Sequence, residues 1–225
     1  MSAAILILRP EPGASATAAR ARTLRLEPVV APLFEVRPLA WELPDPAGLD
    51  AVMLTSGNAP RLAGDGMTPF LRLPCYAVGE ATADAARAAG FRDVRAGPAD
   101  GAALLEAMAA DGIGTAFHPC GRDRTGLRHR AIDLRDVPVY AADAVDRLPA
   151  AARAALDAGA LALLHSPRAA ALFADLVGED RAGVRIAAIS EAAATAAGEG
   201  WQAVEVAARP RDQALLELAA KLCGT

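Results

Sequence analysis

The chain has 225 residues, a formal net charge of −4 and a composition that is 53% hydrophobic, so it is long enough for one large or two small α/β domains. The negative charge argues against nucleic acid as the default partner, and no apolar run reaches the roughly 18 residues that a membrane span needs. Cys75, Cys120 and Cys223 have no metal or redox spacing, which favours a reducing cytoplasm. His118 and Cys120 have no second pair nearby, so no metal site is predicted.

Short apolar runs alternate with helix-forming segments from the N-terminus onward. Ile5–Leu8 predicts a strand covered on both faces, and it lacks the basic region and cleavage site of a signal peptide. Ser15 or Thr17 is expected to cap the helix that follows. A second strand is predicted at 29–30. Residues 34–38 alternate apolar and charged side chains and end in proline, which predicts a half-exposed connector strand.

The stretch Leu54–Ala59 predicts the end of a buried strand that runs directly into a helix. Ser56 stands at the expected N-cap position, and the same pattern returns 110 positions later in Leu164–Ala169, with Ser166 in its place. A strand end followed by such a cap leaves free backbone N–H groups, which can bind an anion. Two ordinary helix caps are the simpler alternative.

The rest of the chain continues the alternation. Further strands are expected at 76–78, 91–95, 115–118, 137–141, 161–164, 185–189 and 204–207, and helices at 79–90, 101–111, 149–158, 166–176, 190–199 and 212–222. The repeat extends along this region: Val78-Gly79-Glu80 matches Ile189-Ser190-Glu191, and Leu104-Leu105-Glu106 matches Leu215-Leu216-Glu217, both at an offset of 111. One repeat of this length predicts two homologous domains, each a parallel α/β sheet.

The first copy of the repeat has no strand like Ile5–Leu8 directly ahead of it. The N-terminal strand and helix are therefore expected to join the C-terminal half of the chain. The predicted division is one lobe from 1–33 plus 142–225 and a second lobe from 39–136, with 34–38 and 137–141 as linker strands that cross between the lobes. Ligands of such sheets bind at the carboxyl ends of the strands.

Six motifs, taken in order, resemble the uroporphyrinogen III synthase family over nearly the whole chain. They are Leu8-Arg9-Pro10, Pro32-Leu33, Thr55–Ala59, Val78–Ala83, Val139-Tyr140 and Ser166-Pro167. The resemblance implies two flavodoxin-like lobes joined by a two-stranded linker, with no cofactor and no metal. It implies that hydroxymethylbilane, a linear tetrapyrrole rich in carboxylates, is converted to uroporphyrinogen III by dehydration, inversion of ring D and macrocycle closure. A cytoplasmic monomer with transient contact to hydroxymethylbilane synthase is expected.

The resemblance also implies site residues for an enzyme that mainly positions its substrate. Tyr140 would assist loss of the hydroxyl as a weak acid, with simple packing as the alternative. Arg9 would meet the substrate, with a salt bridge of the N-terminal loop as the alternative. The expected substrate-binding residues are Arg9, Thr55, Ser56, Gly57, Asn58, Gly79, Thr82, Ser166, Pro167, Ser190 and Glu191.

Some positions depart from the family pattern or favour a plainer interpretation. Ala193 (or Ala192, if the gap is placed earlier) stands where the family has a second helix-opening threonine, which removes a hydroxyl contact there, and Thr195 is out of register. Arg122 and Arg124 could reach a propionate, but a solvated loop is the expected setting. His165 is expected to pack at a strand end.

Two other functions fit the same pattern. A two-lobed cytoplasmic binding or sensor protein for a small acidic ligand would use the same capped helices without turnover. A nucleotide-binding α/β protein is disfavoured, because the chain has no P-loop and Gly112-Ile113-Gly114 lacks the third glycine of the dinucleotide fingerprint.

Overall fold

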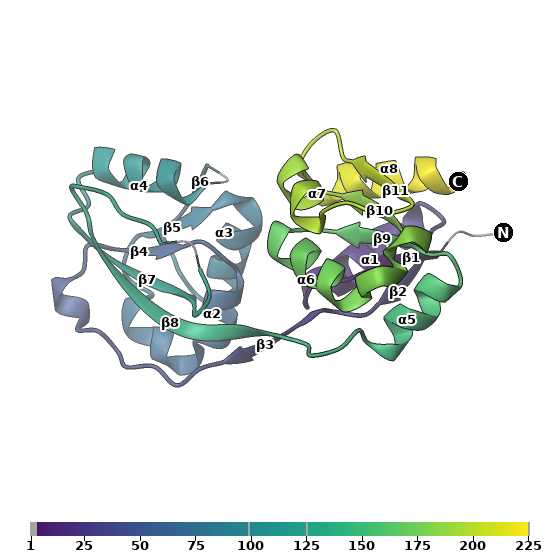
Figure 1. Ribbon diagram of the computed structural model, residues 1–225. Helices are drawn as coiled ribbons and strands as arrows, with labels where there is room; N and C mark the ends of the chain where they lie inside the picture. Colours follow the sequence, from purple (N-terminus) through teal and green to yellow (C-terminus); the bar gives the residue numbers. More distant parts are fainter. Residues whose placement is uncertain (1–3, 99, 125, 225) are drawn as a thin grey trace. The chain divides into compact units, whose positions relative to one another are not determined.

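The computed structural model describes residues 4–98, 100–124 and 126–224 (Figure 1). The chain divides into two compact units: unit 1 comprises Met1–Glu35 with Asp143–Thr225, and unit 2 comprises Val36–Ala142. Residues 1–3 and 225 of the predicted discontinuous lobe lie outside the described residues. Each unit is built on its own sheet.

The sheet of unit 1 is entirely parallel. Its strand order is β11-β10-β9-β1-β2, and each neighbouring pair runs in the same direction. The N-terminal strand therefore lies inside the sheet of the C-terminal half, where Ile5 pairs with Leu161. Its strands are β1 (Ala4–Ile7), β2 (Glu27–Val30), β9 (Leu161–Leu164), β10 (Arg185–Ala188) and β11 (Ala203–Val206).

Helices cover both faces of this sheet, as Figure 1 shows. One core joins β1 and β9 to two helices through Ala14, Ala18 and Ala21 on α1 and Leu215 and Leu216 on α8. The alanines recur at spacings of four and three, so they form one helix face and let α1 lie close to the sheet. The helices of unit 1 are α1 (Gly13–Thr23), α5 (Ala150–Asp157), α6 (Pro167–Val177), α7 (Glu191–Ala197) and α8 (Asp212–Cys223), with a 3₁₀ helix at Gly178–Gly183.

The sheet of unit 2 has the order β3-β8-β7-β4-β5-β6. The pairs from β8 to β6 are parallel, which confirms the predicted parallel α/β class. All four residues of β4 are buried, as an apolar run covered on both faces should be. The strands are β3 (Phe34–Pro38), β4 (Ala51–Leu54), β5 (Cys75–Val78), β6 (Val94–Gly97), β7 (Thr115–Gly121) and β8 (Asp133–Ala144).

Two cores lie on opposite faces of this sheet. One contains alanines of α2 and α3 with Phe70 and Phe117, whose ring centroids are 4.5 Å apart. The other contains Leu104, Leu105 and Met108 of α4. The helices are α2 (Asn58–Leu62), α3 (Gly79–Ala88) and α4 (Gly101–Ala110), with 3₁₀ helices at Pro46–Gly48 and Gly64–Phe70.

Two sequence predictions need correction here. Helix α1 begins at Gly13, so Ser15 and Thr17 lie inside it and do not cap it. The backbone N–H and the hydroxyl of Ser15 both donate to the carboxylate of Glu11, which satisfies the start of the helix from the preceding loop. The strand predicted at 137–141 is present but longer than expected: it is the middle of β8, a twelve-residue strand that pairs with β7 from Asp133 onward. Its role as a linker stays a prediction.

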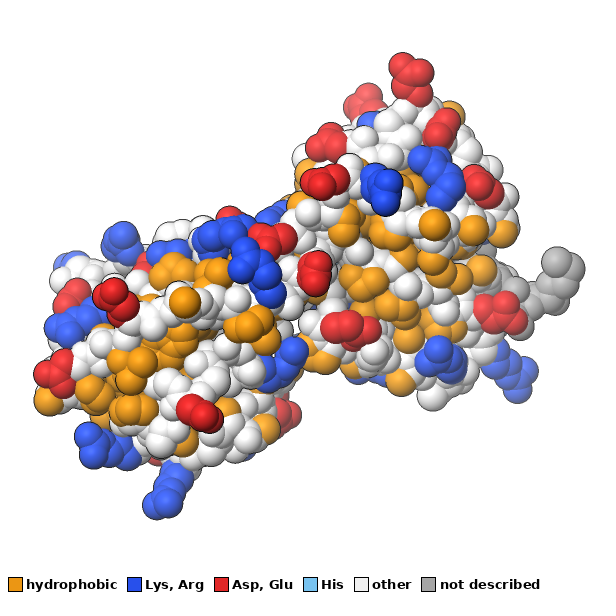
Figure 2. Space-filling model, turned by 90° about the horizontal axis from the view of Figure 1, so that it is seen from below, with side chains coloured by type: hydrophobic (Ala, Val, Ile, Leu, Met, Phe, Trp, Pro, Cys, Tyr) orange, Lys and Arg blue, Asp and Glu red, His pale blue; other side chains and the backbone are white. Residues whose placement is uncertain are grey.

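The helices and one face of the surface can be compared with what a membrane or nucleic-acid partner would require. Among the described residues, no helix combines the length and the apolar character that a membrane span requires. On the faces that Figure 2 shows, acidic and basic side chains are interspersed on each unit and do not gather into one basic patch. This distribution agrees with the small negative net charge.

Candidate functional site

Polar residues of unit 1 gather at the carboxyl ends of its strands. Arg9 follows β1, His165 follows β9, Ser190 follows β10 and Asp212 opens α8 after β11. Because all these strands are parallel, their carboxyl ends share one edge of the sheet. Sequence reasoning named Arg9 and Ser190 here but missed Asp212, which lies far along the chain from its partners.

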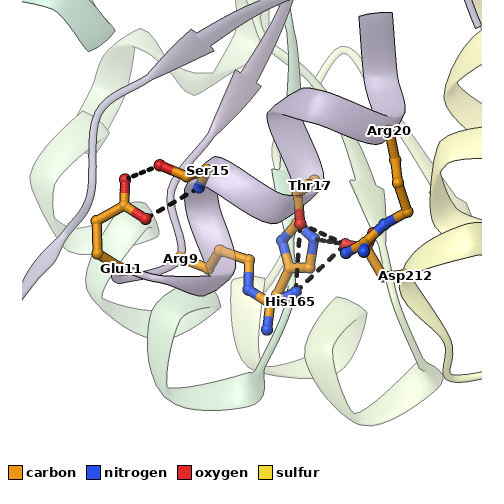
Figure 3. A network of polar contacts seen from close by, with 7 residues as sticks. All are labelled: Arg9, Glu11, Ser15, Thr17, Arg20, His165 and Asp212. Atoms are coloured by element: carbon orange, nitrogen blue, oxygen red, sulfur yellow. Dashed lines mark hydrogen bonds and ion pairs between the residues drawn. The ribbon is translucent and has the colours of Figure 1, made fainter. Parts of the chain in front are cut away.

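The carboxylate of Asp212 is the centre of a partly buried network, drawn in Figure 3. Its Oδ1 accepts hydrogen bonds from the hydroxyl of Thr17 at 2.6 Å and from Nε2 of His165 at 2.9 Å. Nη1 of Arg9 lies 3.3 Å from the same oxygen. Arg20 donates to Oδ2 through Nε and Nη2, each at 2.8 Å. One carboxylate therefore ties β9, α1 and α8 together.

These bonds set the charge and the proton positions. Burial disfavours the ionised form of Asp212, but the hydrogen bonds from His165, Thr17 and Arg20 outweigh it and hold the pKa of this carboxyl far below its ordinary value. An ionised carboxylate only accepts, so Nε2 of His165 carries the proton. Nδ1 of His165 is buried and has no hydrogen-bond partner among the described residues. His165 was expected to pack at a strand end, and it also makes a hydrogen bond to Asp212.

Arg9 is held within this network and is not free in a loop. Its side chain is 33% exposed, and Nη1 also donates to the hydroxyl of Thr17 at 3.3 Å. The salt bridge that the sequence offered as the alternative is thus present. Both bonds use Nη1, and among the described residues the remainder of the partly exposed guanidinium can still meet an anion.

Two of the predicted helix caps of unit 1 are confirmed. Ser166 is the N-cap of α6 and accepts from the backbone N–H of Ala169 at 3.2 Å, with Pro167 in the first turn. Ser190 is the N-cap of α7 and accepts from Ala193 at 3.3 Å. Ala193 is fully buried, so its methyl group packs in the core where a threonine would add a hydroxyl.

The first strand–helix junction of unit 2 differs from its counterpart in unit 1. Helix α2 has five residues and its N-cap is Gly57, so the predicted N-cap position of Ser56 is wrong by one residue. The hydroxyl of Ser56 instead accepts from the backbone N–H of Asn58 at 3.2 Å. A Cβ at Gly57 would lie 3.0 Å from the Cβ of Ala85, so a glycine lets this turn approach α3 closely.

The second junction of unit 2 depends on a glycine for its conformation. Gly79 opens α3 with φ of +70°, a backbone conformation that favours glycine, and no side chain caps this helix. The N-cap residue, Val78, makes no side-chain hydrogen bond to the N–H groups of the first turn. Thr82, one turn into the helix, is 8% exposed, so its hydroxyl is largely covered.

Tyr140 lies at the same carboxyl edge of unit 2. It is on β8 opposite Gly121 of β7, and a Cβ at Gly121 would come within 3.0 Å of the tyrosine ring. The ring packs partly against the core of unit 2 and is half-buried. Its position satisfies both interpretations offered by the sequence, packing and a weak acid at the edge of the sheet.

The structure brings three further residues to this edge that sequence reasoning did not connect. Nδ1 of His118 lies 2.8 Å from Oδ1 of Asp136, and Nε2 of His118 lies 3.0 Å from the hydroxyl of Thr55. Arg124 donates to Oδ2 of Asp136 through Nε at 3.2 Å and Nη2 at 3.0 Å. Arg124 is exposed in the loop after β7, as expected, and it is also paired with this carboxylate. The alternating register of β7 and β8 is the one signal that could have paired His118 with Asp136.

His118, Cys120 and Asp136 place ligand-type atoms within 4.8 Å of one another. Both ring nitrogens of His118 and both oxygens of Asp136 are already in hydrogen bonds. Burial raises the pKa of the Cys120 thiol to about 11, so it is protonated at neutral pH. This geometry favours a hydrogen-bonded network over a metal site.

Two parallel α/β units, each with polar groups at the carboxyl edge of its sheet, define a class of proteins that bind or transform a small polar ligand. Residues 15–217 match the family model described as uroporphyrinogen-III synthase HemD. The chain therefore belongs to the uroporphyrinogen-III synthase family, the cyclising lyases of tetrapyrrole biosynthesis.

Solved structures share the fold. Uroporphyrinogen-III synthetase from Helicobacter pylori has a TM-score of 0.68 and 18% identity, with 99% of this chain and 100% of that chain covered. A mutant uroporphyrinogen III synthase from the extremely thermophilic bacterium Thermus thermophilus has a TM-score of 0.53 and 15% identity, with both chains covered to 100%. A comparison with curated protein sequences gives no significant match.

Proposed function

We propose that the carboxyl edges of the two sheets together carry out the family reaction on hydroxymethylbilane. The observation that carries this proposal is that each edge collects polar groups from elements far apart in the sequence, in a chain that belongs to the synthase family. The substrate offers many carboxylates and pyrrole N–H groups. The enzyme must mainly hold the substrate in the right conformation. Many contacts spread along the substrate serve this purpose better than one strong catalytic group.

Backbone and side-chain donors would bind the carboxylates. In unit 1 we assign Arg9, Ser166, Pro167, Ser190 and Glu191 to the substrate, because they lie at or beside the first turns of α6 and α7 or at the end of β1. In unit 2 we assign Thr55, Ser56, Gly57, Asn58, Gly79 and Thr82, with the uncapped first turn of α3 as the main donor. The covered position of Thr82 favours a supporting role, in which it holds α3 in place.

Tyr140 is the proposed acid. Its phenol would donate a proton to the terminal hydroxyl of the substrate, so that the C–O bond breaks and water leaves. Loss of the pyrrole N–H proton leaves a neutral azafulvene and balances the proton given by the phenol. The substituted carbon of ring D attacks the azafulvene to form a spiro intermediate, and fragmentation and closure then give the inverted ring. The protein supplies position for these later steps. No cofactor or metal is part of the proposal.

The architecture and setting follow from the same interpretation. Numbered in chain order within unit 1, the strands have the order 2-1-3-4-5, which supports a flavodoxin-like lobe. The chain would pass between the lobes at 34–38 and 137–141, close to the unit boundaries at Glu35 and Ala142. Three free cysteines support a cytoplasmic protein, and we propose a monomer that receives its unstable substrate from hydroxymethylbilane synthase in a transient contact.

The test is to supply hydroxymethylbilane and to separate the products by isomer. Spontaneous closure gives isomer I, so the proposal expects isomer III to predominate when the chain is present. A product mixture that matches the protein-free blank would overturn it. Heat-denatured chain is the matched control.

A further inference from the structure

A chain of hydrogen bonds runs through unit 2 from a surface arginine to the edge of the sheet. Arg124 donates twice to Oδ2 of Asp136, Oδ1 of Asp136 lies 2.8 Å from Nδ1 of His118, and Nε2 of His118 lies 3.0 Å from Oγ1 of Thr55. These residues come from the loop after β7, from β8, from β7 and from the end of β4. Four separate segments therefore converge on one line.

The inner residues of this hydrogen-bond chain, His118 and Asp136, are less exposed than Thr55 at its end. His118 is 2% exposed and the Asp136 side chain 12% exposed, so neither offers much surface to a ligand. Thr55 is partly exposed and directly follows the buried strand β4 at the carboxyl edge. Thr55 is therefore placed to contact a substrate at this edge, and the buried His118 can act only through it.

The direction of each hydrogen bond follows from the donors and acceptors. Oδ2 of Asp136 receives two N–H groups from Arg124, so the carboxylate is ionised and Oδ1 must accept from Nδ1 of His118. The neutral ring then has its lone pair at Nε2, and the Thr55 hydroxyl donates its proton inward to that nitrogen. Burial lowers the pKa of His118 despite the neighbouring Asp136, which agrees with a neutral ring.

We propose that His118, oriented by Asp136 and Arg124, is a positioning residue that fixes the Thr55 hydroxyl as a hydrogen-bond acceptor for a pyrrole N–H of the substrate. The inference rests on the proposed function, whose substrate carries such N–H groups. An outward oxygen lone pair attracts an N–H group and repels a carboxylate. Thr55 would therefore select the ring of the substrate, while the helix N-termini bind its acidic side chains.

Replacing Asp136 by asparagine reverses the polarity of this chain. Arg124 has only N–H donors, so the amide oxygen of the asparagine would face Arg124. Its NH₂ group would then face Nδ1 of His118. The proton of His118 would then move to Nε2, as in other His–Asp pairs whose carboxylate becomes an amide. Nε2–H would donate to Thr55, whose hydroxyl would donate outward and no longer accept.

The experiment is a double-mutant cycle on Asp136→Asn and Thr55→Val, read as kcat/KM for isomer III with hydroxymethylbilane as substrate. Each single variant is expected to lose about tenfold, the worth of one hydrogen bond to the reacting complex. In the Thr55→Val background, Asp136→Asn should change the rate by less than about twofold, because its effect passes through Thr55. Losses that multiply in the double variant would overturn the proposal.

A spectroscopic measurement separates positioning from a merely structural role. Nitrogen-15 spectra of the folded chain should show His118 protonated at Nδ1 in the wild type and at Nε2 in Asp136→Asn. Protonation at Nε2 in the wild type would overturn the proposal even if Asp136→Asn does not fold. Thr55→Ser, which keeps the hydroxyl, should retain activity within about threefold of the wild type, and a loss equal to that of Thr55→Val would count against an acceptor role.

The control is Asp111→Asn. Asp111 also accepts from an arginine and a second side chain, Arg95 and Tyr76, but it lies at the end of α4, just before the amino end of β7. Its kinetics should stay within about twofold of the wild type. If the wild-type chain makes no isomer III, the proposed function fails, whereas multiplying losses in an active enzyme would refute the role of His118 alone.

Discussion

Both units hold a histidine–aspartate pair at the carboxyl edge of the sheet, but the two pairs are connected in opposite ways. In unit 1, His165 takes the position that Thr55 has in unit 2 and bonds through Nε2 to Asp212. In unit 2, His118 bonds through Nδ1 to Asp136, so its Nε2 faces Thr55. The first pair is joined to α1 through Thr17 and Arg20, and the second ends at a partly exposed hydroxyl. The same residue types therefore serve cohesion in one unit and a site in the other.

The difference follows from how each unit completes its sheet. In unit 1, β1 and β2 are joined by α1, which supplies Thr17 and Arg20 to Asp212. In unit 2 the corresponding parallel strands, β7 and β8, are joined by residues 122–132, in which the described residues form no helix. Arg124 of this connection takes the place of the helix donors. In unit 2 the His118–Asp136 pair therefore reaches the carboxyl edge of the sheet through Thr55.

Removing the carboxylate of Asp212, the hub of the hydrogen-bond network of unit 1, should have the largest effect. Asp212→Ala leaves buried donors of Thr17 and His165 without an acceptor, and we expect a loss of about 3 to 5 kcal/mol in the free energy of unfolding. Chemical denaturation measures it. Asp180→Ala is the control, because Asp180 pairs with Arg153 at the surface and should change stability by less than about 0.5 kcal/mol. Equal losses in the two variants would remove the distinction between a buried hub and a surface pair.

Tyr140→Phe should have the next largest effect, on rate and not on stability. Loss of a general acid is expected to lower kcat about a hundredfold. Single-turnover kinetics with hydroxymethylbilane measure it. An unchanged rate would show that Tyr140 only packs on Gly121.

Acid should weaken both units in distinct pH windows. His118 has a folded-state pKa below its ordinary value of 6.5, so the unfolded chain binds more protons and stability falls as the pH drops below 6.5. The groups that face it are Asp136, Arg124, Cys120 and Thr55. Asp136 and Asp212 have lowered pKa values, so their contribution is present above pH 3.8 and is lost as the pH falls further.

The slope in each window should approach about 1.4 kcal/mol per pH unit for each proton bound. Denaturation curves at a series of pH values would show both windows. His118→Asn should abolish the upper window and keep the lower one. A stability that rises on acidification would contradict the assignment of ionised carboxylates and a neutral His118.

Arg9→Ala tests whether unit 1 contributes to substrate binding apart from its hub. Asp212 keeps Arg20, Thr17 and His165 as partners, so stability should change by less than about 1 kcal/mol. KM should rise by about fivefold with kcat nearly constant, because a uniform contact to a carboxylate is lost. Arg153→Ala, at the surface of the same unit, is the control. An unaltered KM would show that Arg9 forms its salt bridge but does not contact the substrate.

The serine caps should give the smallest effects. Ser166→Ala removes the side-chain cap of an eleven-residue helix and should cost about 1 kcal/mol. Ser56→Ala should cost less than about 0.5 kcal/mol, because Ser56 precedes the N-cap of a five-residue helix. Thermal unfolding of both variants compares the two copies of the repeat. A larger loss for Ser56→Ala would contradict the unequal caps.

The predictable parts of the fold are those governed by local pattern. Buried strands such as β4 and β9 and the cap at Ser166 follow from short apolar runs and from the serine after them. The length of β8 does not follow from local pattern. Its charged positions are typical of a loop, and pairing with β7 extends the strand over them. Asp212 and Asp136 were missed because their partners lie on other elements, and sequence spacing carries no record of such contacts.

The two histidine–aspartate pairs can be compared in one experiment, because the chain has only three histidines. Nitrogen-15 correlation spectra at neutral pH report which ring nitrogen carries the proton in each. We expect His118 to be neutral and protonated at Nδ1, and His165 to carry a proton at Nε2. Finding the same tautomer in both, or a charged His118, would contradict the opposite connection of the two units.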